Sequence, residues 1–197
     1  MPHPAPLAAS TPSPSAIEAL ARRIDRPLVL VGLMGVGKTS VGRRLATALG
    51  YDFVDADEAI EEAAQMKVAE IFERFGESYF RDGERRVIAR LMSNAGCRPG
   101  QIIATGGGAF ADPDTRALIL DQGLAIWLDS DLDTLVDRVG RTSHRPLLRE
   151  GDPREVLGRL KAERERAYAQ APIHVQSRPG PHQRTVAAIL QELEAWR

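Results

Sequence analysis

The chain has 197 residues, of which 43 % are hydrophobic and 27 % charged, a composition that suits one globular domain with a substantial core. Its 26 basic and 27 acidic side chains leave a net charge of −1, so there is no global basic surplus to favour nucleic acid or a membrane surface. No apolar run approaches the roughly 20 residues needed to cross a bilayer. We therefore expect neither a nucleic-acid partner nor a membrane partner.

The first 15 residues are rich in Pro, Ala and Ser, and they lack the basic and apolar parts of a signal peptide. We expect residues 1–25 to form a disordered or partly helical extension and residues 26–197 to form a single domain. Cys97 is the single cysteine, which excludes an internal disulfide and favours a reducing compartment, the cytoplasm.

Strands and helices are predicted in alternation along the chain. Short apolar runs predict strands at 27–31, 101–105 and 124–128, and further strands are expected at 51–54 and 173–176. Helical spacing of apolar residues predicts helices at 16–23, 39–49, 56–75, 81–92, 113–122, 132–139, 153–170 and 185–196. Gly76 is expected to end the helix at 56–75. This alternation predicts an α/β fold with a largely parallel sheet that is covered on both faces.

The strongest motif is the phosphate loop, residues 32–39, which reads GLMGVGKT and fits G-x-x-x-x-G-K-[ST] between a strand and a helix. Its glycines allow backbone N–H groups to surround phosphate, and the helix start adds a positive dipole end. Lys38 is expected to reach the β- and γ-phosphates, and the Thr39 hydroxyl to bind Mg²⁺. We expect a three-layer P-loop NTPase fold, similar to nucleoside monophosphate kinases, with a mostly parallel sheet of about five strands. Kinases, switches and motors share this motif.

Two carboxylates, Asp55 and Asp57, follow the second strand at the carboxyl edge, where ligands of such sheets bind. One could hold a metal-bound water while the other meets a substrate hydroxyl. Local sequence also allows Asp57 to be only the N-cap of the next helix.

Arg81 and Glu84 lie three residues apart, so Glu84 can orient a guanidinium that grips a carboxylate. The same pair could be a surface ion pair, which typically contributes less than about 1 kcal/mol. Residues 106–108 form a glycine triplet at a strand end, which indicates a close approach of the backbone to another group. Arg164 and Arg166 lie in a charged run that is usually a solvated helix face.

Residues 138–148 are basic and irregular, as in a loop that closes over phosphates. An arginine delivered by such a loop stabilises charge on the transferring γ-phosphoryl group. The four histidines show no metal-ligand spacing, and none is assigned a role.

Together, these stretches resemble the shikimate kinase family from about Arg26 to the C-terminus. Four features match in order and spacing: the GLMGVGKTS loop, the VDAD pair, GESYFRDGE and the strand that ends in TGGGA. A fifth, RTSHRPLL, has the form of that family's lid, near residues 141–154. The resemblance implies transfer of the ATP γ-phosphoryl group to the 3-hydroxyl of shikimate, a step of chorismate and aromatic amino-acid biosynthesis.

The resemblance also implies residue roles, with Lys38, Asp57 and Arg145 as the catalytic group. It implies that ATP is bound by Gly35, Val36, Gly37, Lys38, Thr39, Ser40, Arg138 and Arg145, with Arg138 packed on adenine. It implies that Mg²⁺ is bound directly by Thr39 and through water by Asp55. It implies that shikimate is bound by Asp57, Arg81, Gly107 and Arg164.

Residues 176–182 depart from the family pattern, so the residues that close the adenine pocket stay unassigned, Arg178 and Pro181 among them. The nearest alternative is a related kinase acting on gluconate or a nucleoside monophosphate. A nucleotide-dependent switch is an alternative of another class, and hydrolysis without an acceptor would distinguish it. No extended apolar surface stripe stands out, so we expect a monomer.

Overall fold

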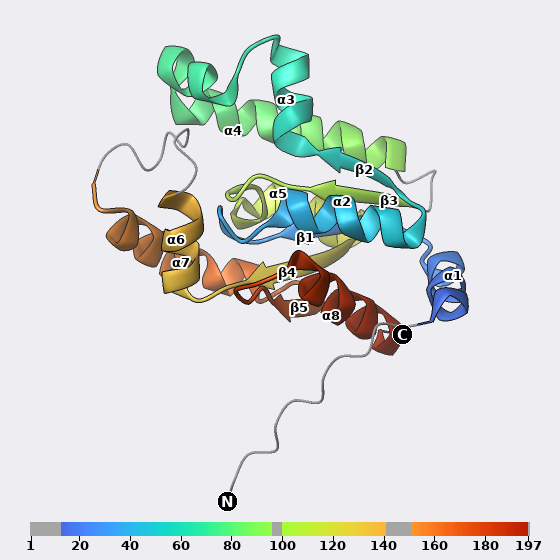
Figure 1. Cartoon of the computed structure of the whole chain (residues 1–197). Coiled ribbons are helices and arrows are strands. Elements are labelled where there is room, and N and C mark those ends of the chain that lie inside the picture. Colours follow the sequence, from blue (N-terminus) through green and yellow to red (C-terminus); the bar gives the residue numbers. More distant parts are fainter. Residues whose placement is uncertain (1–12, 96–99, 141–150, 197) are drawn as a thin grey trace, which may run out of the picture.

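The computed structural model describes residues 13–95, 100–140 and 151–196, and these form one twisted sheet covered by helices (Figure 1). The strands are β1 (Leu28–Val31), β2 (Asp52–Asp55), β3 (Gln101–Ala104), β4 (Leu124–Asp129) and β5 (Ile173–Gln176). Their order in the sheet is β2-β3-β1-β4-β5, and every pairing is parallel. The predicted α/β fold with a parallel sheet of about five strands is confirmed.

Helices cover both faces of the sheet. They are α1 (Pro14–Arg23), α2 (Lys38–Leu49), α3 (Ala56–Ala64), α4 (Val68–Ala95), α5 (Pro113–Gln122), α6 (Leu132–Gly140), α7 (Pro153–Tyr168) and α8 (His182–Ala195), with a short 3₁₀ turn η1 (Ala109–Ala111). Figure 1 shows α2 and α8 on one face of the sheet and α5 on the other. Among the described residues, no helix is both long and apolar enough to span a membrane.

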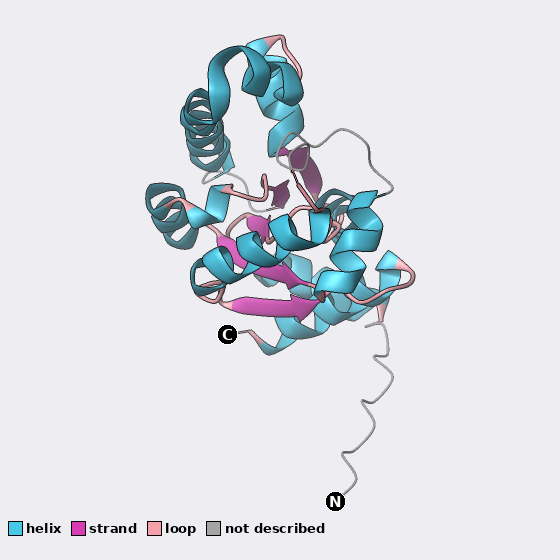
Figure 2. Cartoon of the chain, turned by 90° about the vertical axis from the view of Figure 1, so that its left-hand side faces the viewer, coloured by secondary structure: helices cyan, strands magenta, loops and turns pink. Residues whose placement is uncertain are grey.

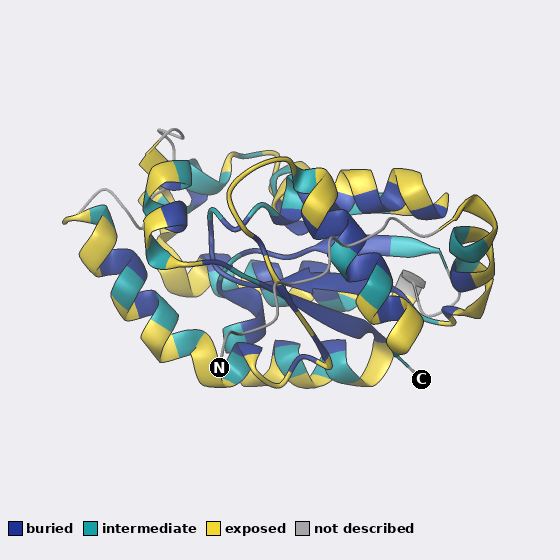
Figure 3. Cartoon of the chain, turned by 60° about the horizontal axis from the view of Figure 1, so that its bottom comes forward, coloured by how far each residue is buried: buried dark blue, intermediate teal, exposed yellow. Residues whose placement is uncertain are grey.

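The middle of the sheet is the core of the molecule. All four residues of β1 are fully buried, as strands covered on both faces require, and Figure 3 shows the central strands as a buried layer between half-exposed helices. The parallel register pairs Ala104 of β3 with Leu30 of β1 on one side and with Asp55 of β2 on the other. The segments that follow β1, β2 and β3 therefore start from one edge of the sheet.

Helix α1 packs onto this core from the N-terminal side. Leu20 and Ile24 are buried in the main core cluster. The Tyr51 hydroxyl donates a hydrogen bond to the Ala21 carbonyl at 2.6 Å. The core therefore includes side chains that precede residue 26.

The predicted helix at 56–75 was wrong in one respect, because the structure has two helices in this stretch. Helix α3 ends at Ala64, its C-cap residue Gln65 takes a left-handed conformation (φ 51°), and α4 begins at Val68. Glu61 stabilises the restart by accepting hydrogen bonds from the Val68 N–H and from Lys67. No Gly or Pro marks this break, so the sequence carried no strong signal for it.

The expected interruption at Gly76 is present. Gly76 has non-helical angles (φ 80°, ψ 175°) inside α4. A second apolar cluster, formed by Ile60, Ile71, Phe80 and Val87, joins α3 to α4. The two helices project beyond the β2 edge of the sheet, as Figures 1 and 2 show.

Gly42 lets α2 approach the sheet closely, and its replacement tests this packing. A Cβ atom there would lie 2.5 Å from Phe53 Cε2 and 3.1 Å from Leu30 Cδ1. Gly42→Ala is expected to lower the free energy of unfolding by about 1–3 kcal/mol through overpacking.

Gly83→Ala in α4 is the matched control, because nothing lies within 4 Å of its Cβ position. Alanine there should raise the free energy of unfolding by up to about 1 kcal/mol. Urea denaturation measures both, and equal effects would contradict this packing.

Candidate active site

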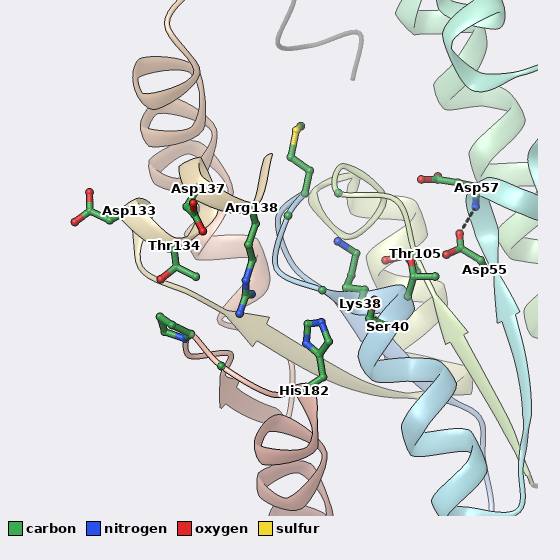
Figure 4. A pocket seen from close by; sticks show the side chains of 17 residues that line it. Lys38, Ser40, Asp55, Asp57, Thr105, Asp133, Thr134, Asp137, Arg138 and His182 are labelled. Carbon is green, nitrogen blue, oxygen red and sulfur yellow. Dashed lines mark hydrogen bonds between the residues drawn. The ribbon is translucent and has the colours of Figure 1, made fainter. Parts of the chain in front are cut away.

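A cavity of about 890 Å³ opens at the carboxyl edge of the sheet. Figure 4 shows Lys38 near its centre, with Asp55 and Asp57 on one side and Arg138 and His182 on the other. The residues lining it come from the phosphate loop, from the ends of β2 and β3, from α6 and from the segment after β5: Met34, Gly35, Gly37, Lys38, Thr39, Ser40, Asp55, Asp57, Thr105, Gly107, Asp133, Thr134, Asp137, Arg138, Pro179, Gly180 and His182.

The phosphate loop is curled around the Lys38 side chain, which is largely buried. Lys38 Nζ donates hydrogen bonds to the carbonyls of Gly32 (2.7 Å) and Leu33 (2.9 Å). Gly35 and Gly37 have φ angles of 82° and 99°, a left-handed region that glycine enters without steric cost. Helix α2 begins at Lys38, so its positive dipole end faces the cavity and favours an anion there.

Ser40 and Val36, both expected to bind ATP, differ in their position relative to the cavity. Ser40 lines the cavity, whereas the Val36 side chain is buried and lies outside the cavity lining. The Val36 carbonyl accepts hydrogen bonds from Arg138 and Ser177.

Asp55 links β2 to the phosphate loop. Its Oδ2 accepts a hydrogen bond from the Thr39 hydroxyl at 2.7 Å, and its Oδ1 accepts one from the Asp57 N–H at 3.0 Å. Asp55 is therefore the N-cap of α3, and the alternative that Asp57 serves only as that cap is wrong. Asp57 lies in the first turn of α3 and lines the cavity.

Thr39 and Asp55 fit a magnesium ion chemically. A hydroxyl and a carboxylate are hard oxygen ligands, and Mg²⁺ usually takes one or two protein ligands while keeping waters and binding substrate phosphates. Within the described part of the chain there is no cluster of three or more His, Cys, Asp or Glu side chains that could hold a metal by itself. The pair therefore suits a metal whose other ligands come from a nucleotide and water.

Arg81 and Glu84 form a largely buried pair in α4. Arg81 donates to Glu84 at 2.8 Å, and on its other side it donates to Glu77 at 2.9 Å. Glu84 is only 2 % exposed, so the alternative of a surface ion pair is wrong. Burial raises the pKa of Glu84, while the Arg81 guanidinium opposes that shift. Burial by itself would lower the pKa of Arg81, but Glu84 and Glu77 raise it above its ordinary value.

Two members of the glycine triplet leave space for these groups. A Cβ atom on Gly106 would lie 2.2 Å from Glu84 Oε1 and 3.1 Å from Asp57 Oδ1. A Cβ atom on Gly108 would lie 2.5 Å from Arg81 Nη1. The backbone at the end of β3 therefore touches all three charged side chains, which is the close approach that the sequence indicated.

The middle glycine contacts different partners. A Cβ atom on Gly107 would lie 3.0 Å from the Met34 backbone nitrogen in the phosphate loop. The Gly107 carbonyl accepts hydrogen bonds from Arg164 Nη1 at 2.8 Å and from the Tyr168 hydroxyl. Arg164 is thus turned toward the triplet, while Arg166 is exposed. We call the group Asp57, Arg81, Glu84, residues 106–108 and Arg164 the acid end of the site.

Arg138 lies on the opposite side of the cavity. Its guanidinium donates hydrogen bonds to the Val36 carbonyl (3.1 Å), to Ser177 Oγ (3.1 Å) and to the Arg178 carbonyl (2.9 Å). Burial lowers the pKa of this guanidinium. The segment that could not be assigned from sequence is thereby placed: Arg178 contributes its carbonyl, and Pro181 is the N-cap residue of α8.

His182 is a site residue that the sequence reasoning missed. It lines the cavity together with Pro179 and Gly180, and its Cε1 lies 3.2 Å from where a Cβ on Gly37 would be. The signal for it was its position just after the last strand of a parallel sheet, on the edge where ligands bind. We call Arg138 and residues 179–182 the Arg138 side of the cavity.

Arg145 and most of the expected lid at 141–154 lie outside the described residues, as does Cys97.

The pKa of His182 is lowered by burial and by the nearby Arg138 and Arg44. As the pH falls, the unfolded chain therefore binds this proton first. The contribution of His182 to stability is present above about pH 6.5 and is lost as the pH falls through the folded value. His182→Gln removes this pH-dependent contribution, so the wild type should lose more stability than the variant between about pH 7 and about pH 5. Melting temperatures across this range measure the difference, and parallel curves would contradict the environment described.

Comparison with known proteins agrees with this geometry. The sequence model of the shikimate kinase family matches residues 34–194. The shikimate kinase of Novosphingobium aromaticivorans is 62 % identical over 184 residues, which cover 93 % of this chain and 95 % of that protein.

Solved structures give the same result. The shikimate kinase from Acinetobacter baumannii, in complex with shikimate, superposes with a TM-score of 0.82 at 33 % identity, covering 93 % of this chain and 98 % of that one. A gluconokinase from Sinorhizobium meliloti has a TM-score of 0.59 at 18 % identity, covering 88 % of this chain and 94 % of that one, which shows a shared fold alone. The family match and the identity to its members show that the chain belongs to the shikimate kinase family.

Proposed function

We propose that the chain transfers the γ-phosphoryl group of ATP to the 3-hydroxyl of shikimate, giving shikimate 3-phosphate and ADP. The observation that carries this proposal is a cavity that joins the phosphate loop to Asp57 and Gly107, beside which Arg81 is held by Glu84 and Arg164 by the Gly107 carbonyl. The phosphate loop and the Thr39–Asp55 pair suit a nucleotide with its metal, and the acid end suits a hydroxylated carboxylic acid.

The nucleotide is held by the phosphate loop and by the Arg138 side of the cavity. Backbone N–H groups at the start of α2 and the Lys38 ammonium group bind the phosphates, for which Lys38 leaves the carbonyls it now contacts. Arg138 and His182 flank the adenine. Thr39 and Asp55 would hold Mg²⁺, Thr39 directly and Asp55 through water, and the ion would supply charge neutralisation at the phosphates.

At the acid end, Arg81 and Arg164 bind the substrate carboxylate. A guanidinium is a planar fork of donors that matches a carboxylate bidentately, provided its orientation is fixed. Glu84 and Glu77 fix Arg81, and the Gly107 carbonyl fixes Arg164. The Gly107 backbone lies at the substrate between them.

Asp57 accepts a hydrogen bond from the attacking hydroxyl and takes its proton as the phosphoryl group is transferred. Phosphoryl transfer has a loose transition state, so positioning and charge neutralisation supply most of the rate acceleration. Arg145, in the segment that resembles the family's lid, adds positive charge at the transferring group.

The remaining parts of the proposal are a monomer and a cytoplasmic location. Within the described residues, the large hydrophobic side chains that are exposed are Phe75 and Tyr79, a small apolar area for a stable subunit interface. The single cysteine suits a reducing compartment.

The test is ADP release by the purified protein with Mg²⁺ and ATP, with shikimate, gluconate or AMP added separately. We expect release that depends on shikimate, because two arginines and Asp57 match a carboxylate and a hydroxyl and the chain belongs to the shikimate kinase family. AMP carries a phosphate and a base and has no carboxylate for Arg81 and Arg164 to bind. Release with gluconate or AMP alone would reassign the acid end while leaving the phosphate loop in place. Equal release without any acceptor would favour a nucleotide-dependent switch.

A further inference from the structure

We propose that Tyr168 is a positioning residue of the acid end: its hydroxyl fixes the Gly107 carbonyl and, through that shared acceptor, the guanidinium of Arg164. The inference rests on the proposed function, because it assigns Tyr168 an effect on the binding of the acid substrate.

The Tyr168 ring is held firmly in one orientation. It is 2 % exposed and stacks between two aromatic rings, Phe110 with centroids 6.5 Å apart and Trp127 with centroids 5.9 Å apart. Burial raises the pKa of Tyr168 to about 12, so the phenol keeps its proton at neutral pH and remains a donor. A rigid donor of this kind can define the position of its acceptor.

The acceptor is the Gly107 carbonyl, which also receives Arg164 Nη1 at 2.8 Å. A carbonyl oxygen has two lone pairs, and these two donors use both. On its other side, the Gly107 Cβ position is 3.0 Å from the Met34 nitrogen. The Gly107 peptide is therefore held between α7 and the phosphate loop. Arg164 lies one helical turn before Tyr168 on α7, and a guanidinium carries five N–H donors, so Arg164 can bind a ligand as well as the Gly107 carbonyl.

The alternative is that Tyr168 is simply a core residue whose hydroxyl needs any partner. Tyr51 represents that case in the same chain, because its hydroxyl also donates to a backbone carbonyl, that of Ala21 at 2.6 Å. Neither Tyr51 nor Ala21 lines the cavity, whereas Gly107 does. The two tyrosines thus make similar hydrogen bonds, one at the site and one away from it.

The experiment compares Tyr168→Phe with Tyr51→Phe, each of which removes one hydroxyl and keeps the ring. For Tyr168→Phe we expect the KM for shikimate to rise about three- to tenfold, the loss of one good hydrogen bond. The KM for ATP should stay within about twofold, since the nucleotide contacts other residues. Tyr51→Phe should change neither KM. An unchanged shikimate KM in Tyr168→Phe, or an equal rise of both KM values, would overturn the inference.

A double-mutant cycle separates this inference from the proposed function. Arg164→Ala alone should raise the KM for shikimate, and adding Tyr168→Phe to it should raise that KM less than it does in the wild type, because part of the effect passes through Arg164. Multiplicative effects would overturn the inference and leave the proposed function intact. An Arg164→Ala variant with a normal shikimate KM would instead contradict the acid end itself. Arg166→Ala, an exposed arginine on the same helix, is the control for the loss of one positive charge.

Discussion

Three residues without side chains, the glycines at 106–108, follow strand β3 after Thr105, and the candidate site depends on the space that they leave. The parallel register places this end between the phosphate loop after β1 and Asp55 at the end of β2. Cβ atoms on Gly106 and Gly108 would overlap with Glu84 and Arg81, Asp57 lies close to the Gly106 position, and the phosphate loop lies against Gly107. The phosphate loop and the charged side chains of the acid end can therefore approach each other because the backbone between them carries no side chains.

The second constraint is electrostatic. A carboxylate as buried as Glu84 is costly unless it is paired, and Arg81 provides the pair at 2.8 Å. Within the described residues, Glu84 Oε1 has no hydrogen-bond partner, so this carboxylate is only partly satisfied by the protein. Its benefit is orientation, since Glu84 and Glu77 together hold the Arg81 guanidinium against rotation. The buried Glu84 carboxylate therefore costs some stability, and in return it fixes the orientation of the Arg81 guanidinium.

The strand order along the chain and the phosphate loop of the site follow from local sequence. The three central strands are apolar runs with clear ends, and the phosphate loop is a motif in which spacing and context coincide, so neither needs tertiary information. The glycine triplet indicated that something approaches the end of β3. It could not say what, because Glu84, Arg81, Asp57 and Met34 come from elements distant in the chain.

The features that sequence did not reveal depend on tertiary packing. Arg164 reads as a solvated helix residue until α7 is placed against Gly107, and the family resemblance rather than its neighbours pointed to a role. His182 becomes part of the cavity only because α8 starts beside the phosphate loop. The break at Gln65 lacks Gly or Pro, and it is stabilised by Glu61 from the preceding helix.

Gly108→Ala tests whether the glycine triplet leaves the space in which Arg81 is positioned at the acid end. Gly108 has φ −105° and ψ −18°, which alanine can adopt, so the effect of the substitution is one of space. The new Cβ would lie 2.5 Å from Arg81 Nη1, the movable end of a long side chain, so Arg81 should shift while the fold is kept. We expect the KM for shikimate to rise about tenfold or more, with the KM for ATP within about twofold of the wild type. An unchanged shikimate KM, or a matching rise in the KM for ATP, would contradict it.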